Sequence, residues 1–406
     1  MDFIRMPRNK FSRGRKNNEA GYTIGLKVTM ISGIVYSIAM QMAIILVPLY
    51  SIQIGLPPLG LAFLISLPAI FQMAIRLFGG MLNNYFGERS ILKFSFLCIS
   101  FAGVIFVAGD SMGNLYTAQL LLALSRGLFW STAQTYLSKL PEVTGRLNKV
   151  FGLYEGSVAL GSTLGLIFGG FMNQWFGFTV AFSCIIVIGL INFFLCNLLP
   201  ELQQRDRQEV FLKGFNSLLE VARHKPLYLA GICAFTAALP LSLIGSFYPV
   251  YLDSLNIESG MIGLIISLKS VGVITAGMVI ARLLDRINLV VSYSFSLVLV
   301  GSTLIITQMF STPAPLAAII IFTGLGSGIS SVLYQTLTSK YSTEHNRGSA
   351  MAFTTNFWSL SHLVTPVMFG AVTEYMGISY SFVIAGVAIL VLGFLGTFTF
   401  RWFTAV

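Results

Sequence analysis

The segment QTYLSK at residues 134–139 recurs as QTLTSK at residues 335–340, with four of its six positions matched at an offset of 201. A second pair repeats at almost the same interval, since GFMNQWFGFTVAF at 170–182 matches GAVTEYMGISYSF at 370–382 at an offset of 200. A single insertion or deletion reconciles the two offsets. The chain is therefore predicted to consist of two homologous halves.

The composition is that of a membrane protein. Apolar residues make up 55% of the 406 residues and charged residues only 10%, whereas roughly a quarter of the residues in soluble globular chains are charged. Apolar segments of about 19–25 residues recur along the chain, and a helix needs roughly 20 such residues to cross a bilayer. A β-barrel would instead show alternating segments of about ten residues. The predicted fold is an all-α membrane protein with twelve transmembrane helices, at 27–50, 60–82, 91–109, 114–138, 150–172, 178–199, 227–251, 260–282, 289–309, 314–338, 349–372 and 378–400.

The basic residues predict the orientation, because Lys and Arg in short loops are retained on the cytoplasmic side. With the N-terminus inside, all but three of the 25 Lys and Arg residues fall at cytoplasmic ends of the chain, and no outside loop contains one. The exceptions, Arg76, Arg126 and Lys269, lie within predicted spans. Both termini are thus expected in the cytoplasm of a cell whose plasma membrane the chain crosses, and the net charge of +10 follows from topology without nucleic-acid binding.

The domain division falls at the polar segment 201–225. We expect a basic cytoplasmic tail at 1–26, a six-helix bundle at 27–199, a linker at 200–226 and a second six-helix bundle at 227–406, in a monomeric protein. The tail is expected to be disordered and to touch anionic lipid, with an organelle transit peptide as the alternative. The cysteines lie in apolar spans without CxxC or CxxH spacing, so neither a disulfide, a metal site nor a cofactor is expected.

The polar stretch GGMLNNYFGERS at 79–90 separates the second and third spans. Together with the twelve duplicated spans, it resembles the major facilitator superfamily, which has G-x-L-x-D-R-x-G-R-K between these helices. Gly80, Leu82 and Gly87 match, Arg89 supplies the final basic residue, and Asn84 replaces the family's Asp. The resemblance implies a loop that turns sharply at glycine and latches the other half, with Asn84 reduced to a neutral hydrogen bond. Ordinary loop polarity is the alternative.

The second half contains a matching loop, ARLLDRIN at 281–288, which keeps the pair Asp285 and Arg286 but lacks the later glycine. Helix five carries a second resemblance. Its sequence from Gly152 to Gly170 is similar to the motif G-x8-G-x3-G-P-x2-G-G of proton-linked antiporters, which implies export. The matching glycines are Gly152, Gly161, Gly165, Gly169 and Gly170, and Leu166 replaces the proline.

Small residues four positions apart form a flat ridge on which another helix can pack closely. Between two moving halves, the helix-five ridge could slide or seal. A ridge that only packs closely is the alternative interpretation.

Three potential cations, Arg126, Lys269 and His362, lie about 12–13 residues from the cytoplasmic ends of their spans, or roughly 18–20 Å deep. Ionisable residues in a span cost roughly 2.5–3.5 kcal/mol on insertion scales and usually face a cavity or a partner. Their common depth in both halves predicts a central pocket for an anionic or zwitterionic ligand, in which Arg126 can grip a carboxylate bidentately. Burial of each within its own half is the alternative. The remaining predicted pocket residues are Tyr36, Gln41, Trp130, Gln134, Tyr334, Asn356 and Trp358.

Glu155 is the only carboxyl group in the interior of a predicted span. Burial favours the neutral form of a carboxyl group, so a proton on Glu155 could be exchanged for substrate. Arg76 lies at a similar depth, roughly 9 Å from the inner face. A static ion pair between the two side chains, or a Glu155 that faces the cytoplasm, is the alternative.

These observations predict a proton-coupled secondary transporter that exports a small anionic, zwitterionic or amphiphilic organic molecule, such as a drug or a secreted metallophore. The expected partners are the substrate, protons and the lipid bilayer. A proton- or sodium-coupled symporter that imports an organic anion is the first alternative, and a membrane receptor that does not transport is a remote one. An enzyme is not expected, because the sequence contains no P-loop, HExxH or CxxC motif.

Overall fold

A computed structural model describes residues 9–109, 111–139, 147–201, 220–280, 288–343 and 346–404, and these residues form helices without a strand. The N-terminal half contains α1 (Asn9–Gln53), α2 (Pro58–Phe86), α3 (Glu88–Ala108), α4 (Met112–Lys139), α5 (Leu147–Leu195) and the short η2 (Cys196–Leu198). The C-terminal half contains α7 (Lys225–Ser254), α8 (Ser259–Ser267), α9 (Lys269–Thr275), the π-helical η3 (Ala276–Ile280), α11 (Leu289–Thr307), α12 (Pro313–Lys340), α13 (Arg347–Met376) and α14 (Ile378–Thr404).

Each of the twelve predicted spans coincides with a helical segment of the described residues. The 49-residue α5 supplies two of them, because the backbone of Gly177 leaves the helical conformation and starts a second helix. Conversely, α8, α9 and η3 together form one span. Helices must satisfy all their backbone hydrogen bonds within the hydrocarbon, which is why long apolar runs are good predictors of helical spans. The predicted all-helical membrane fold is confirmed.

Three glycines make the sharp turns between consecutive helices. Gly87, Gly177 and Gly377 have φ angles of 79°, 78° and 83°, a region that is unfavourable for residues with a Cβ atom. Gly177 and Gly377 are also matched in the internal repeat at an offset of 200. The two halves therefore share a glycine turn with a positive φ angle as well as a sequence pattern.

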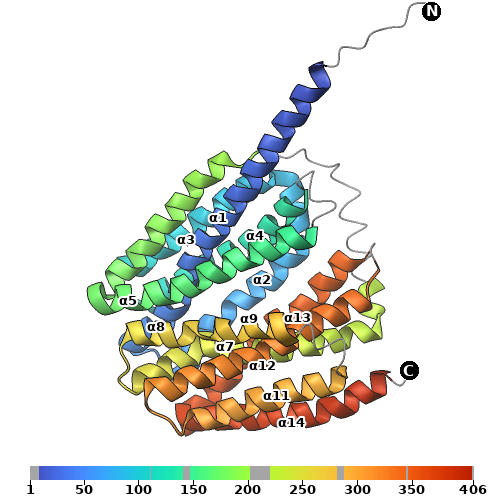
Figure 1. The fold of residues 1–406 in the computed structure, drawn as a ribbon. Helices are drawn as coiled ribbons and strands as arrows, with labels where there is room; N and C mark the ends of the chain where they lie inside the picture. Colours follow the sequence, from blue (N-terminus) through green and yellow to red (C-terminus); the bar gives the residue numbers. More distant parts are fainter. Residues whose placement is uncertain are drawn as a thin grey trace, which may run out of the picture.

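The two halves form two adjacent helical bundles (Figure 1). Within the first bundle α1 packs on α5 and α3 on α4, and within the second α11 packs on α14 and α7 on α13. The bundles meet where α2 lies along α13 and where α5 lies along α8. These contacts leave room for a cavity between the bundles.

The outer faces of the bundles are apolar. Phe101 on α3, Phe194 on α5 and Phe295 on α11 are among many large apolar side chains exposed at the surface. A soluble protein rarely exposes such a surface, whereas a membrane protein turns it toward lipid. Among the described residues, eight helices are long and apolar enough to cross a membrane.

Two local predictions were wrong. Helix α1 begins at Asn9, so the described part of the predicted disordered tail is helical. Extending an existing helix is much easier than nucleating one, and the apolar span supplies the nucleus. Similarly, α2 continues through Phe86, and the loop expected at 79–90 contracts to the single residue Gly87.

Candidate functional site

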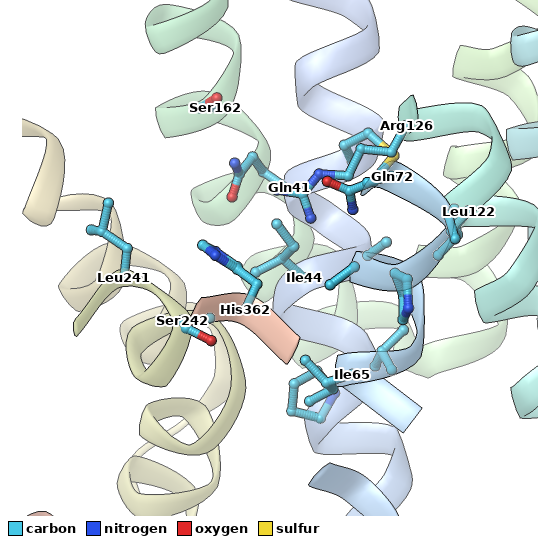
Figure 2. A pocket seen from close by; sticks show the side chains of 18 of the residues that line it. Gln41, Ile44, Ile65, Gln72, Leu122, Arg126, Ser162, Leu241, Ser242 and His362 are labelled. Atoms are coloured by element: carbon cyan, nitrogen blue, oxygen red, sulfur yellow. The ribbon is translucent and has the colours of Figure 1, made fainter. Parts of the chain in front are cut away.

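A cavity of about 330 Å³ lies between the bundles (Figure 2). Helices α1, α2, α4 and α5 line it from the N-terminal half, and α7, α9 and α13 line it from the C-terminal half. Aliphatic residues and two prolines make up much of its wall. The polar, charged and aromatic side chains of the wall are Gln41, Gln72, Gln119, Arg126, Ser162, Ser242, Lys269, Ser270, Trp358 and His362.

Five of the predicted pocket residues line this cavity, namely Arg126, Lys269, His362, Gln41 and Trp358. Arg126 comes from the first half and Lys269 from the second, so neither side chain is enclosed in its own bundle. Figure 2 shows the Arg126 side chain beside Gln41 and Gln72, while His362 enters the cavity from the opposite bundle. Arg126, Lys269 and His362, for which helical rise predicted the same depth, thus line the same cavity.

The cavity wall is cationic. Among the described residues, no Asp or Glu lines it. The salt bridges of the described residues, Arg89–Glu201 and Lys139–Glu88, involve neither Arg126 nor Lys269. Two positive groups that face one space without a carboxylate on its wall provide complementary charge for an anion.

Unsatisfied polar atoms accompany these charges. Ser242 is only 3% exposed, and its Oγ atom has no hydrogen-bond partner among the described residues. The same is true of the buried Oε1 atom of Gln41. Buried polar groups are normally paired, so both atoms are suited to bonding with a ligand or with water.

Lys269 lies at an interruption of the eighth span. Helix α8 ends at Ser267, and α9 starts at Lys269 after the intervening Leu268. A π-helical segment, η3, follows at Ala276, and such segments occur frequently at functional sites. The next residue, Ser270, forms a hydrogen bond of 3.2 Å between its Oγ atom and Thr163 Oγ1 of the other half. This irregularity was not predicted from the sequence.

His362 and Trp358 form one aromatic wall of the cavity. Their rings are nearly parallel, at 20°, with centroids 5.9 Å apart. The Nδ1 atom of His362 lies 3.1 Å from the Trp358 carbonyl oxygen. Because a carbonyl only accepts, Nδ1 is the protonated nitrogen in this bond. The pair offers a planar surface for the apolar part of a ligand.

The other predicted pocket residues do not line the cavity. Tyr36 is fully buried in the first bundle, where its hydroxyl bonds to Ser125 Oγ at 3.0 Å and its ring stacks on Phe129. Tyr334 packs beside the lining residue Trp358. Asn356 is partly buried, with its Oδ1 atom enclosed and unpaired among the described residues.

Trp130, Gln134 and Glu155 lie on the faces of α4 and α5 that carry lining residues. Trp130 and Gln134 follow Arg126 by one and two helical turns, and Glu155 precedes Ala159 by one turn. The Glu155 side chain retains solvent access, and Gln134 is its side-chain hydrogen-bond partner. The side chain of Arg76 lies outside the described residues.

The helix-five glycines pack mainly within their own half. A Cβ atom on Gly161 would lie 2.3 Å from the Ile34 carbonyl oxygen, and one on Gly165 would lie 2.5 Å from the Ile38 carbonyl oxygen. Gly169 likewise faces Met42 of α1, whereas Gly152 faces open space. The interpretation as a ridge between moving halves is therefore wrong for Gly161, Gly165 and Gly169, whereas Gly170 does face Ser259 of the other half. Glycine spacing identifies a close contact but not the helix that makes it.

The polar turn after α2 is anchored within the first half in this conformation. Arg89 forms its salt bridge with Glu201 at 3.1 Å and donates to the Asn197 carbonyl oxygen at 2.6 Å, while Glu88 pairs with Lys139. Gly80 and Asn84 belong to α2, but the Asn84 side chain lies outside the described residues. Asp285 and Arg286 lie outside them as well.

Sequence reasoning missed Gln72, Gln119, Ser162 and Ser242. Helical spacing could have found three of them, since Gln119 precedes Arg126 by seven residues, Gln72 precedes Arg76 by four and Ser162 follows Glu155 by seven. Ser242 lies in the span 227–251, which contains no charged residue, and its position became clear only when the helices were packed.

Comparisons with known proteins agree with this architecture. The sequence profile of the Major Facilitator Superfamily matches residues 29–239 and 230–404. An uncharacterized MFS-type transporter of Methanocaldococcus jannaschii is 19% identical over 354 residues, which cover 85% of this chain and 90% of that protein. Quinolone resistance protein NorA of Staphylococcus aureus is 24% identical over 213 residues, or 50% of this chain and 52% of its own length.

Solved structures share the fold at low identity. The nucleoside transporter NupG has a TM-score of 0.78 and 11% identity, covering 93% of this chain and 99% of its own. A bacterial homolog of the human lysosomal transporter Spinster has a TM-score of 0.77 and 12% identity, covering 94% and 98%. With both halves matched by the family profile, the chain belongs to the major facilitator superfamily and is a multi-pass membrane transporter.

Proposed function

We propose that this transporter exports a small anionic, zwitterionic or amphiphilic organic molecule in exchange for protons, by alternating access to the cavity between its halves. The observation that supports this proposal is the placement of Arg126 and Lys269, one from each half, on a wall whose described residues include no carboxylate. A planar guanidinium can hold a carboxylate through two parallel hydrogen bonds, and an ammonium group contributes a point charge.

The anion has a second role in this proposal. Arg126 and Lys269 interact electrostatically across the cavity, and like charges oppose the approach of the two halves. A bound anion offsets this repulsion, because it is attracted to both side chains. The Trp358 and His362 rings then contact the apolar body of the substrate, while Gln41 and Ser242 bond to its polar groups.

Export and proton coupling rest on further arguments. The helix-five glycine pattern is similar to that of proton-linked antiporters, and similar proteins include Multidrug resistance protein 2 of Bacillus subtilis, at 22% identity over 199 residues. Glu155 is the proposed proton carrier. It lies one turn from the cavity wall on α5 and shares a hydrogen bond with Gln134, so a proton there can affect the cavity-lining helices.

Transport into inverted membrane vesicles tests the proposal. The vesicle interior is acidified, and accumulation of a fluorescent quinolone carboxylate is followed with and without an uncoupler. Export predicts accumulation that requires the pH gradient and is lost in Arg126→Gln. Uptake of the probe by whole cells, with no accumulation in inverted vesicles, would reverse the assigned direction.

An importing symporter is the second candidate. A similarity of 28% over 137 residues to Dipeptide and tripeptide permease A of Edwardsiella piscicida favours it, although this stretch is only 32% of the chain. The same cations would hold the carboxylate of an imported zwitterion. The whole-cell arm of the vesicle experiment separates the two directions.

A further inference from the structure

Two hydrogen bonds join the halves at equivalent places of the internal repeat. The Oε1 atom of Gln174 accepts from the backbone N–H of Gly260 at 3.1 Å. The Oε2 atom of Glu374 accepts from the backbone N–H of Leu59 at 3.2 Å. The two acceptors are 200 positions apart and the two donors 201, which are the offsets of the repeat. Each bond is therefore the counterpart of the other.

Both bonds complete the first turn of a helix from the opposite half. Leu59 is the second residue of α2, and Gly260 is the second residue of α8. The N-cap residues of these helices, Pro57 and Glu258, provide no side-chain hydrogen bond. The first N–H groups of a helix lack partners within it and are normally capped by a nearby side chain. Here the cap is supplied across the interface.

Glycines allow the two helices of each contact to approach closely. A Cβ atom on Gly170 would lie 2.3 Å from the Ser259 carbonyl oxygen, and one on Gly370 would lie 3.0 Å from the Pro58 carbonyl oxygen. These glycines are themselves matched in the repeat, and each precedes its capping residue by four positions. Residues four apart share a helix face, so close approach at the glycine brings the next turn to the opposing helix end.

Additional bonds reinforce one of the two contacts. The Ser259 hydroxyl donates to the Gly170 carbonyl oxygen at 3.1 Å, and the Gln174 amide nitrogen donates to a Glu258 carboxylate oxygen. The other contact relies on the Glu374 carboxylate, whose negative charge is favoured at the N-terminus of α2. The two contacts thus share a geometry, but the capping residue is a neutral amide in one and a carboxylate in the other.

We propose that Gln174 and Glu374 are a duplicated pair of positioning residues, here called the paired caps, which hold the halves together at the end of the molecule where α2 and α8 begin. Both caps must break before the cavity can open at that end. By the predicted topology this is the outer end. The role of the paired caps depends neither on the direction of transport nor on the substrate.

Distance measurements between spin labels on the full-length transporter in nanodiscs test the paired caps. The labels are placed at Met112 and Met309, which are exposed residues at the same end of opposite halves, and the distance between them increases when this end opens. The four native cysteines are replaced by serine so that only these two positions are labelled. Loss of one net hydrogen bond of about 0.5–1 kcal/mol corresponds to roughly a 2- to 5-fold change in the ratio of open to closed states. Gln174→Ala and Glu374→Ala should each raise the ratio of open to closed states by this factor. The double variant should raise the ratio roughly 5- to 25-fold.

Two matched variants serve as controls. Glu374→Gln keeps an acceptor oxygen and should retain most of the closed population. Tyr375→Ala alters the neighbouring residue, which is 88% exposed, and should leave the distances unchanged. Hydrogen exchange at Leu59 and Gly260 gives a second readout, since loss of each cap should accelerate exchange at its own donor. Unchanged distances and exchange in the double variant, or equal opening in Tyr375→Ala, would overturn the proposal.

Discussion

The packing of α5 on α1 predicts that two glycine substitutions in one helix have opposite effects on stability. At Gly161, a Cβ atom would lie 2.3 Å from the Ile34 carbonyl oxygen, more than 1 Å inside an ordinary contact of roughly 3.5 Å. At Gly152, nothing lies within 4 Å of the added atom. The pair therefore compares the same chemical change in a closed and an open environment.

The magnitude follows from two opposing effects. Replacing a helical glycine by alanine lowers the conformational entropy of the unfolded chain and favours the helix by roughly 0.5–1 kcal/mol at either site. Overpacking a close contact costs typically about 1–3 kcal/mol, because α1 must move away. We expect Gly152→Ala to stabilise the protein by about 0.5–1 kcal/mol. Gly161→Ala should destabilise it by up to about 2 kcal/mol.

Thermal unfolding of the purified variants in one detergent, followed by intrinsic fluorescence at a single heating rate, measures these effects. A change of 1 kcal/mol corresponds to a shift in Tm of a few degrees at most in a chain of this size. The decisive observation is the sign, with Tm raised in Gly152→Ala and lowered in Gly161→Ala. If Gly161→Ala were as stable as Gly152→Ala, the assigned packing of α5 on α1 would be refuted.

Three further predictions concern transport and the repeat. Arg126→Gln should weaken binding of a carboxylate probe about 10- to 150-fold, equivalent to a charged hydrogen bond of roughly 1.5–3 kcal/mol, with Arg126→Lys intermediate; unchanged affinity by calorimetry would exclude the guanidinium from the site. Glu155→Gln should abolish pH-driven accumulation in vesicles but leave probe binding intact, and normal coupling in this variant would dismiss Glu155 as the proton carrier. Gly177→Ala and Gly377→Ala should each destabilise the chain by about 1 kcal/mol or more, because both φ angles are near 80°, and a Tm equal to that of the parent protein would contradict this expectation.

The glycine contacts of the molecule are of two kinds, those within one half and those between the halves. The Gly161 contact lies inside one half, whereas the Gly170 and Gly370 contacts lie between halves. Substitutions within a half should change its stability, and those between halves should change the conformational equilibrium. The helix-five motif therefore combines residues of both kinds along one helix.

The sequence was sufficient to predict how deep in the bilayer several residues of the site lie. Because each helical residue rises 1.5 Å, the distance of Arg126 and Lys269 from their span ends placed both near the middle of the bilayer. Which side of a helix faces the cavity is a different question. Tyr36 lies at a suitable level, yet it packs against Phe129 inside the first bundle. Gln72 and Ser242 carried no charge to attract attention, and only the packed helices brought them to the cavity wall.

The number of spans, their approximate positions and the duplication of the chain were determined by the sequence alone, because lipid requires long apolar helices and a repeat leaves a constant offset. The tertiary structure decided which surfaces these helices share. It assigned Gly161 to a contact inside one half and Gly170 to a contact between halves, although both belong to the same motif. The physical reason is that close packing depends on the partner helix and its rotation, and neither is encoded in the spacing of residues along a single helix.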